Sequence, residues 1–306
     1  MIKMKNNTIG EIIRDLRKRH ELSQEELAEG ICSAVSISRI ENGTQMPSQT
    51  VLEKLLQRLG TGTYEICNIF YKNEKQQVFE EAAAKVFSLI SQGNLSTAEE
   101  ELLKIKEEAK EEEQNWQYYL LLEVSIEIHR NNISEQLLET LHKALRLTKP
   151  RLDYSELRHE LLTIREANIL SIIVVLYFKL DRVVEAIKLG EELMKSLAAH
   201  KSGLHEYQII KINLALNLAQ CLEKEGRYGE ALDYACKAEE ISFTTTQHIL
   251  LPEIQFIKAK IYHLKGEDEL CISILKAVVP YMELIKKKSF ADLVRRYARE
   301  EFDLRI

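Results

Sequence analysis

The stretch Leu22–Pro47, LSQEELAEGICSAVSISRIENGTQMP, holds the strongest local folding signals in this chain of 306 residues. Ser23 and Glu26 have the S-x-x-E spacing of a capping box, which satisfies the free backbone groups at the start of a helix. A second serine, Ser33, can begin the next helix, Ala34–Glu41. The stretch therefore predicts two short helices joined by a tight turn.

Apolar residues at helical spacing predict two more helices around this pair. One spans Ile9–Arg19 and the other spans Ser48–Leu59. Asn42 and Gly43 are expected to end the helix before them, because both residues tolerate the left-handed backbone conformation. The first sixty residues thus predict a small four-helix module.

The composition favours an all-α, globular protein. The chain is 45% hydrophobic and 29% charged, with only 11 glycines and 4 prolines. Its net charge of −6 divides into +1 for residues 1–60 and −7 for the rest, so any basic surface is local. Five dispersed cysteines, no apolar leader and no apolar run long enough for a membrane predict a cytoplasmic protein without a membrane partner.

Behind the module, the chain repeats a pattern of a turn residue followed five positions later by a helix-packing residue. Successive copies are 39, 49, 45 and 40 residues apart, as expected of helical hairpins with loops of variable length. The five pairs are Gly93 and Ala98, Asn132 and Leu137, Asp181 and Ala186, Gly226 and Ala231, and Gly266 and Cys271. The stretch Ser289–Phe302 is expected to form a capping helix.

The module resembles the helix-turn-helix of the Cro/repressor family over about residues 8–60, through SQEELAEGI, SISRIENG and LEKLLQRLG. The resemblance implies an ion pair between Arg17 and Glu41 and a third helix that enters the major groove. Ser33 can equally be only a cap, and Arg39 only a solvated charge. The candidate DNA-binding residues are Gln24, Ser33, Ala34, Val35, Ser36, Arg39, Asn42 and Thr44.

The best repeat copy, Ile212–Ile241, resembles a tetratricopeptide repeat, whose first helix lines a concave groove. Asparagine side chains at groove positions can hold the backbone amides of a peptide, and lysines can take a carboxylate. Alternatively, these asparagines are simply exposed and the lysines favour a helix C-terminus. The candidate peptide-binding residues are Asn168, Lys179, Asn213, Asn217, Gln220 and Lys224.

In layout, the whole chain resembles the Rgg/PlcR/PrgX group of peptide-pheromone receptors. The resemblance implies a transcriptional regulator with a helix-turn-helix domain at 1–60, a linker helix at 61–75 and an α-solenoid of about five degenerate tetratricopeptide-like repeats at 76–306. It also implies a homodimer that binds a palindromic operator in double-stranded DNA, controlled by a short signalling peptide in quorum sensing.

Two other functions remain open from the sequence. The repeat domain could bind a partner protein such as a response regulator, or the module could serve for dimerisation without binding DNA. The chain contains no metal-binding, nucleotide-binding or nucleophile motif, so we expect no enzymatic activity and no cofactor.

Overall fold

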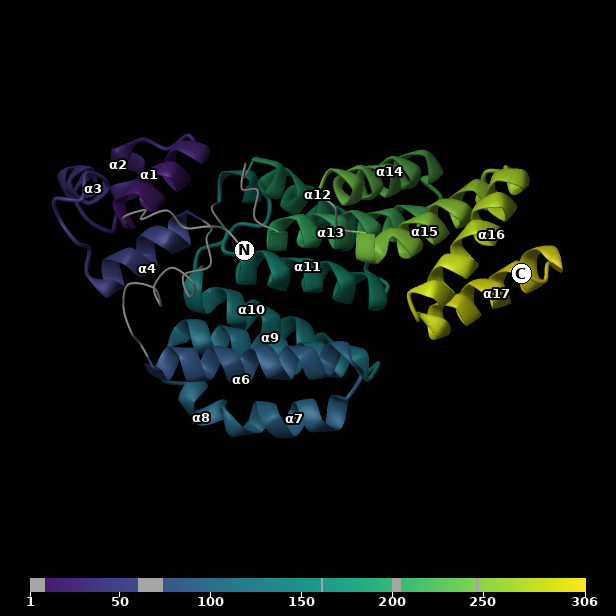
Figure 1. Ribbon diagram of the computed structural model, residues 1–306, viewed down its shortest axis with the longest axis horizontal. Coiled ribbons are helices and arrows are strands. Elements are labelled where there is room, and N and C mark those ends of the chain that lie inside the picture. Colours follow the sequence, from purple (N-terminus) through teal and green to yellow (C-terminus); the bar gives the residue numbers. More distant parts are fainter. Residues whose placement is uncertain (1–8, 60–73, 161, 200–204, 246–247) are drawn as a thin grey trace. The chain divides into compact units, whose positions relative to one another are not determined.

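The computed structural model describes residues 9–59, 74–160, 162–199, 205–245 and 248–306, and every regular element in these ranges is a helix (Figure 1). The chain divides into two compact units. Unit 1 contains Met1–Leu176 and Lys195–Ser202, and unit 2 contains Tyr177–Met194 and Gly203–Ile306. The all-α fold class predicted from the sequence is confirmed.

Four helices form the N-terminal module, which we call the head (residues 9–59). Its helices pack around one apolar cluster that includes Ile13, Leu27, Ile37 and Leu55, all fully buried. Burial of these side chains is the main stabilising contribution to a domain of this size. The helices are α1 (Ile9–Arg19), α2 (Gln24–Ala28), α3 (Ala34–Glu41) and α4 (Gln49–Arg58).

The caps of the head helices are those that the sequence predicts. The Glu26 amide donates to the Ser23 hydroxyl at 3.1 Å, and the Ser23 amide donates to the Glu26 carboxylate at 2.6 Å. Ser33 and Ser48 begin α3 and α4. After α3, only Gly43 adopts a positive φ, of 70°, so the helix ends on the glycine and its neighbour Asn42 keeps an ordinary backbone conformation.

The helices after the head in unit 1 form hairpins. Helix α6 packs on α7, and α9 packs on α10. Buried Gln117 donates to the Ala144 carbonyl at 2.9 Å and to the Thr148 hydroxyl, which donates in turn to buried Glu166. These helices are α6 (Glu74–Ser91), α7 (Leu95–Lys104), α8 (Lys106–Ala109), α9 (Glu113–His129), α10 (Glu135–Thr148) and α11 (Ile164–Lys179), which continues into unit 2 from Tyr177.

Unit 2 repeats the hairpin arrangement, with α13 packed on α14 and α15 packed on α16. Helix α17 packs on α16. The ring of Phe256, in α15, packs edge-to-face with the rings of Phe290 and Tyr297, in α17. The helices are α12 (Val183–Ala199), which continues into unit 1 from Lys195, α13 (His205–Lys224), α14 (Tyr228–Thr244), α15 (Leu251–Leu264), α16 (Asp268–Leu284) and α17 (Lys288–Phe302).

The turns between paired helices show that one of the predicted repeat positions is wrong. The backbone is left-handed at Gly93, Asp181, Gly226 and Gly266, as the pattern requires. In the second copy, however, the left-handed residue is Asn131 and the buried one is Leu138, so the pair Asn132 and Leu137 is wrong. The turn is longer there, since α10 begins four residues after Asn131.

A sixth turn of the same kind was not predicted. Lys286 has a φ of 62°, α17 begins two residues later, and Ala291, five residues on, is fully buried. The capping helix is therefore attached by the same turn as the repeats before it.

The linker predicted at 61–75 lies outside the described residues except for Glu74 and Lys75, which belong to α6. The domain boundaries at 60 and 75 stay a prediction. Within the described ranges, no helix is both long and apolar enough to span a bilayer.

Candidate DNA-binding and ligand-binding surfaces

Arg17 and Glu41 form the ion pair that joins α1 to α3. The Arg17 guanidinium donates through Nε and Nη2 to the two Glu41 carboxylate oxygens, at 2.5 and 2.8 Å. Its Nη1 donates to the Leu22 carbonyl at 2.8 Å. The Glu41 side chain is 1% exposed and that of Arg17 is 12% exposed. This two-point contact fixes the position of α3 against the rest of the head.

The surroundings of Glu41 decide its charge. Burial alone would raise the pKa of Glu41, but hydrogen bonds from Arg17 and Gln24, with the charges of Arg17 and Arg14, lower this pKa below its ordinary value. The carboxylate therefore stays ionised in the folded head at neutral pH. The hydrogen bond to Glu41 likewise raises the pKa of Arg17.

The outer face of α3 carries the residues best placed to touch DNA. Its inner face is filled by Ile37 and Ile40, whereas Val35 is 60% exposed. Arg39, one turn further along, is also exposed, and its side chain makes no hydrogen bond or ion pair with the described residues. Ala34 and Ser36 flank Val35 and are partly exposed, and Ala34 also packs against the core of the head. The outer face of α3 thus presents the apolar side chain of Val35 beside the guanidinium of Arg39, which has no partner among the described residues.

The four other predicted DNA-binding residues already have partners within the head. Gln24 donates to Glu41 at 2.9 Å, and the Thr44 hydroxyl donates to the Arg39 carbonyl at 3.0 Å. Ser33 caps α3, and its hydroxyl lies 2.9 Å from that of Ser36. The Asn42 amide oxygen accepts from Arg14. Their contacts with DNA stay a prediction. Each of these side chains would have to contact DNA in addition to its partner within the head.

Two arginines of the head were missed by the sequence reasoning. Arg14 links α1 to Asn42 at the end of α3. Arg58, in α4, donates to the carbonyls of Glu26, Leu27 and Glu29 and so satisfies the C-terminal end of α2. Exposed basic residues are common in the last turn of a helix, so the position of Arg58 along the chain gave no signal of this contact.

Four of the predicted peptide-binding residues lie on one face of α13. Asn213, Asn217, Gln220 and Lys224 follow the spacing i, i+4, i+7 and i+11, which places them in one stripe. The Asn213 and Lys224 side chains are exposed, while Asn217 and Gln220 are partly exposed. The three amides have no hydrogen-bonding partner among the described residues. We call these four residues the amide stripe.

The lysine of the amide stripe is not free. Lys224 Nζ lies 2.5 Å from Asp181 Oδ1 and 5.4 Å from the centre of the Phe178 ring. Both partners belong to unit 2, and the ion pair is exposed, so it contributes little to stability and can be exchanged for another carboxylate. Lys179 is exposed. Asn168 belongs to unit 1, where it is partly exposed, and it is not placed relative to the amide stripe.

Among the residues that the structure describes, no group of three or more His, Cys, Asp or Glu side chains is arranged to hold a metal ion.

Together, the head and the hairpins define an all-α protein in which a helix-turn-helix module precedes a series of helical repeats. Residues 13–66 match the model of the helix-turn-helix family. No curated protein matches the chain in sequence.

Solved structures with the same fold cover nearly the whole chain. The PlcR of Bacillus thuringiensis, in complex with the peptide PapR7 and DNA, is 18% identical with a TM-score of 0.64, over 93% of this chain and 98% of that one. The same protein in its apo form gives 20% identity and 0.58, over 93% and 97%. Apo ComR of Streptococcus vestibularis gives 14% and 0.53, over 96% and 98%. These comparisons agree with the resemblance inferred from the sequence.

Proposed function

We propose that this protein is a transcriptional regulator that binds DNA through α3 and binds a short signalling peptide through its repeats. The observation that carries the proposal is the outer face of α3, where Val35 and Arg39 are exposed on a helix whose other face is buried. PlcR, which has the same fold, has been crystallised with both a peptide and DNA. An apolar side chain can contact a thymine methyl group, and a guanidinium can pair with guanine.

The DNA-binding part is tested by Arg39→Gln. Duplexes selected from a random pool by the full chain are titrated by fluorescence anisotropy at several salt concentrations. We expect R39Q to weaken binding by about 1–3 kcal/mol, as loss of one paired guanidinium does. The control R299Q changes an exposed arginine of α17 and should bind as the wild type does. Equal affinities of R39Q and the wild type for the duplex would contradict the assignment of α3 as the DNA-contacting helix.

Support for a peptide ligand comes from the amide stripe. A side-chain amide offers one acceptor and two donor hydrogens, which match the backbone groups of a peptide in any sequence. Asn213, Asn217 and Gln220 present these groups in line along α13, at intervals of three or four residues. Nothing in the described part of unit 2 uses them for folding.

The peptide-binding part is tested by the double variant N213A/N217A. Each lost amide contact costs about 0.5–1.5 kcal/mol, so the pair should weaken binding about fivefold or more. Calorimetry uses synthetic peptides that cover the C-terminal ends of small secreted precursors encoded beside the gene. The control N132A removes an asparagine from an exposed turn of unit 1. Peptide binding that is equally strong in N213A/N217A would contradict the assignment.

An exposed apolar stripe on α16 supports a homodimer. Leu270, Ala277, Tyr281 and Leu284 lie at i, i+7, i+11 and i+14, and Leu284 is 77% exposed. A second copy packed antiparallel would cover this stripe on both chains, as two-fold symmetry requires.

The charges at the two ends of α16 agree with an antiparallel pair. Glu269 is exposed at the start of the helix, and Lys286 and Lys288 are exposed just after its end. None of the three forms an ion pair within the described residues. In an antiparallel pair, the acidic start of each helix would face the basic end of the other.

The dimer is tested by A277E/Y281E, which changes the centre of the stripe, away from the lysines at the helix ends. In an antiparallel pair the carboxylates introduced at position 277 would face each other across the two-fold axis and prevent association, because burying them unpaired is strongly unfavourable. Sedimentation equilibrium should give the dimer mass for the wild type and the monomer mass for the variant. V184E, which alters an apolar residue of α12 that is 67% exposed, is the control and should remain dimeric. A wild type that is monomeric at every concentration, or a dimeric double variant, would contradict this surface.

The competing function is a repeat domain that binds a partner protein such as a response regulator. It predicts that no short peptide binds while the DNA-binding result still holds. The two experiments therefore distinguish this function from the proposed one.

A further inference from the structure

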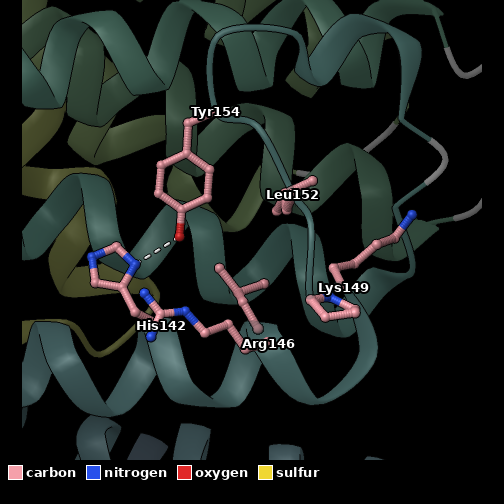
Figure 2. Close-up of a pocket in the computed structure, with 7 residues that line it drawn as sticks. His142, Arg146, Lys149, Leu152 and Tyr154 are labelled. Carbon is pink, nitrogen blue, oxygen red and sulfur yellow. Dashed lines mark hydrogen bonds between the residues drawn. The ribbon is translucent and has the colours of Figure 1, made fainter.

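A pocket of about 260 Å³ opens at the C-terminal end of α10, within unit 1 (Figure 2). One wall is formed by His142, Arg146 and Lys149, at positions i, i+4 and i+7 of the helix and its end. Residues at this spacing are neighbours on a helix surface. None of its lining residues belongs to α3 or to the amide stripe.

The opposite wall is the segment that follows α10 and folds back beside it. The Tyr154 hydroxyl lies 2.6 Å from Nδ1 of His142, and the two rings stack with their centres 5.6 Å apart. Figure 2 shows the hydroxyl directed at the imidazole ring. This contact holds the segment against the helix, so the pocket is a built feature of the fold.

The charges around the pocket leave one positive charge unbalanced. Lys149 Nζ lies 2.8 Å from Glu160 Oε2, so these two charges offset each other. Arg146 is exposed and forms no ion pair with the described residues. The Arg146 guanidinium is therefore the positive charge in the pocket lining that no carboxylate of the described residues pairs with.

The remaining lining is apolar. Leu145 is almost fully buried, and Leu152 and the Pro150 ring lie beside it. The volume is below the roughly 300–1,000 Å³ of sites for drug-sized ligands. The pocket therefore suits a small occupant, whose apolar part would lie against Pro150 and Leu152.

We propose that this pocket binds the carboxylate of a small monoanion with a short apolar body, with Arg146 as the paired donor. A guanidinium matches a carboxylate through two parallel hydrogen bonds. One unbalanced positive charge fits a carboxylate monoanion better than a phosphate dianion, which would leave a negative charge uncompensated in the pocket. The carboxylate can belong to a free branched-chain acid or to the C-terminal residue of a peptide.

The test uses histidine-labelled full-length protein, with the His142 signal assigned by NMR through H142Q. The ligands are 4-methylpentanoate for a free acid and N-acetyl-leucine for a peptide C-terminus. N-acetyl-leucinamide is the neutral control and phenyl phosphate the dianionic one. We expect both carboxylates to shift the His142 signal to saturation at millimolar concentration and the amide to leave it unchanged. R146Q should weaken the binding about tenfold.

The matched control is R151Q, which removes an exposed arginine that lies outside the pocket lining. It should bind both carboxylates as the wild type does. Tighter binding of N-acetyl-leucine than of 4-methylpentanoate supports a peptide C-terminus as the source of the carboxylate. Equal binding of the two ligands supports a free acid. The proposal is overturned if neither carboxylate shifts the signal, if the amide or phenyl phosphate binds as well, or if R146Q and R151Q behave alike.

Discussion

Glu41→Ala is expected to unfold the head while the repeats remain folded. The substitution leaves the Arg17 guanidinium largely buried beside an apolar methyl group, with only the Leu22 carbonyl as partner. Removal of one member of a buried ion pair costs about 3–5 kcal/mol, which is a large part of the stability of a domain of this size. Gln24 loses its acceptor at the same time.

Hydrogen exchange of the full chain, followed by mass spectrometry, separates the two responses. Fragments from residues 9–59 should exchange faster in E41A, and fragments from α13 to α17 should not change. Unchanged protection of the head would contradict the role given to this ion pair.

The same pair predicts how the head responds to acid. Because the folded head lowers the pKa of Glu41, the carboxylate stabilises the head above its ordinary pKa of 4.5. This stabilisation is lost as the pH falls through the lowered value. The advantage of the wild type over E41Q, which keeps the shape of the side chain, should therefore disappear in acid. A constant difference in head stability between pH 7 and pH 3 would contradict this account.

Gly10→Ala is expected to be the second strongly destabilising change. A Cβ atom at position 10 would lie 1.9 Å from the carbonyl oxygen of Ile40 and 3.1 Å from Cα of Glu41. Both are backbone atoms of α3, so no side chain can move aside, and α1 must separate from α3. Overpacking of this kind costs about 1–3 kcal/mol or more. It would also pull Arg17 away from Glu41.

The matched control for this substitution is Gly229→Ala in α14. A Cβ atom there meets nothing within 4 Å, so the methyl group is accommodated. Alanine should then stabilise that helix by about 0.5–1 kcal/mol. Thermal unfolding of both variants gives the comparison. Equal unfolding temperatures for G10A and the wild type would show that α1 and α3 are not in close contact.

The head could be predicted closely because its signals are local. The capping box at Ser23 and Glu26, and the N-cap at Ser33, act within four residues and depend little on distant packing. Contacts between distant helices left no such signal. Gly10 reads as an ordinary helical glycine, and only the structure shows that α3 lies against it.

The sequence predicted that the repeats are helical hairpins, but it did not predict the position of every turn. Glycine marks three of the left-handed positions, because it lacks the Cβ atom that disfavours this conformation. Lys286 and Asn131 adopt the same conformation without that sequence signal, so one turn was missed and another was displaced by one residue. The pocket beside α10 could not be foreseen, since Tyr154 reaches His142 from a segment without regular structure.

The most direct test of the central claim is the affinity of the full chain for a selected duplex, measured with and without a synthetic signalling peptide. Coupling between the two sites should change the dissociation constant of the duplex by about 5–150-fold. The variant N213A/N217A should keep the peptide-free affinity and need at least about five times more peptide to give the same change. A chain that binds the duplex with the same dissociation constant whatever peptide is added would contradict a ligand-controlled regulator.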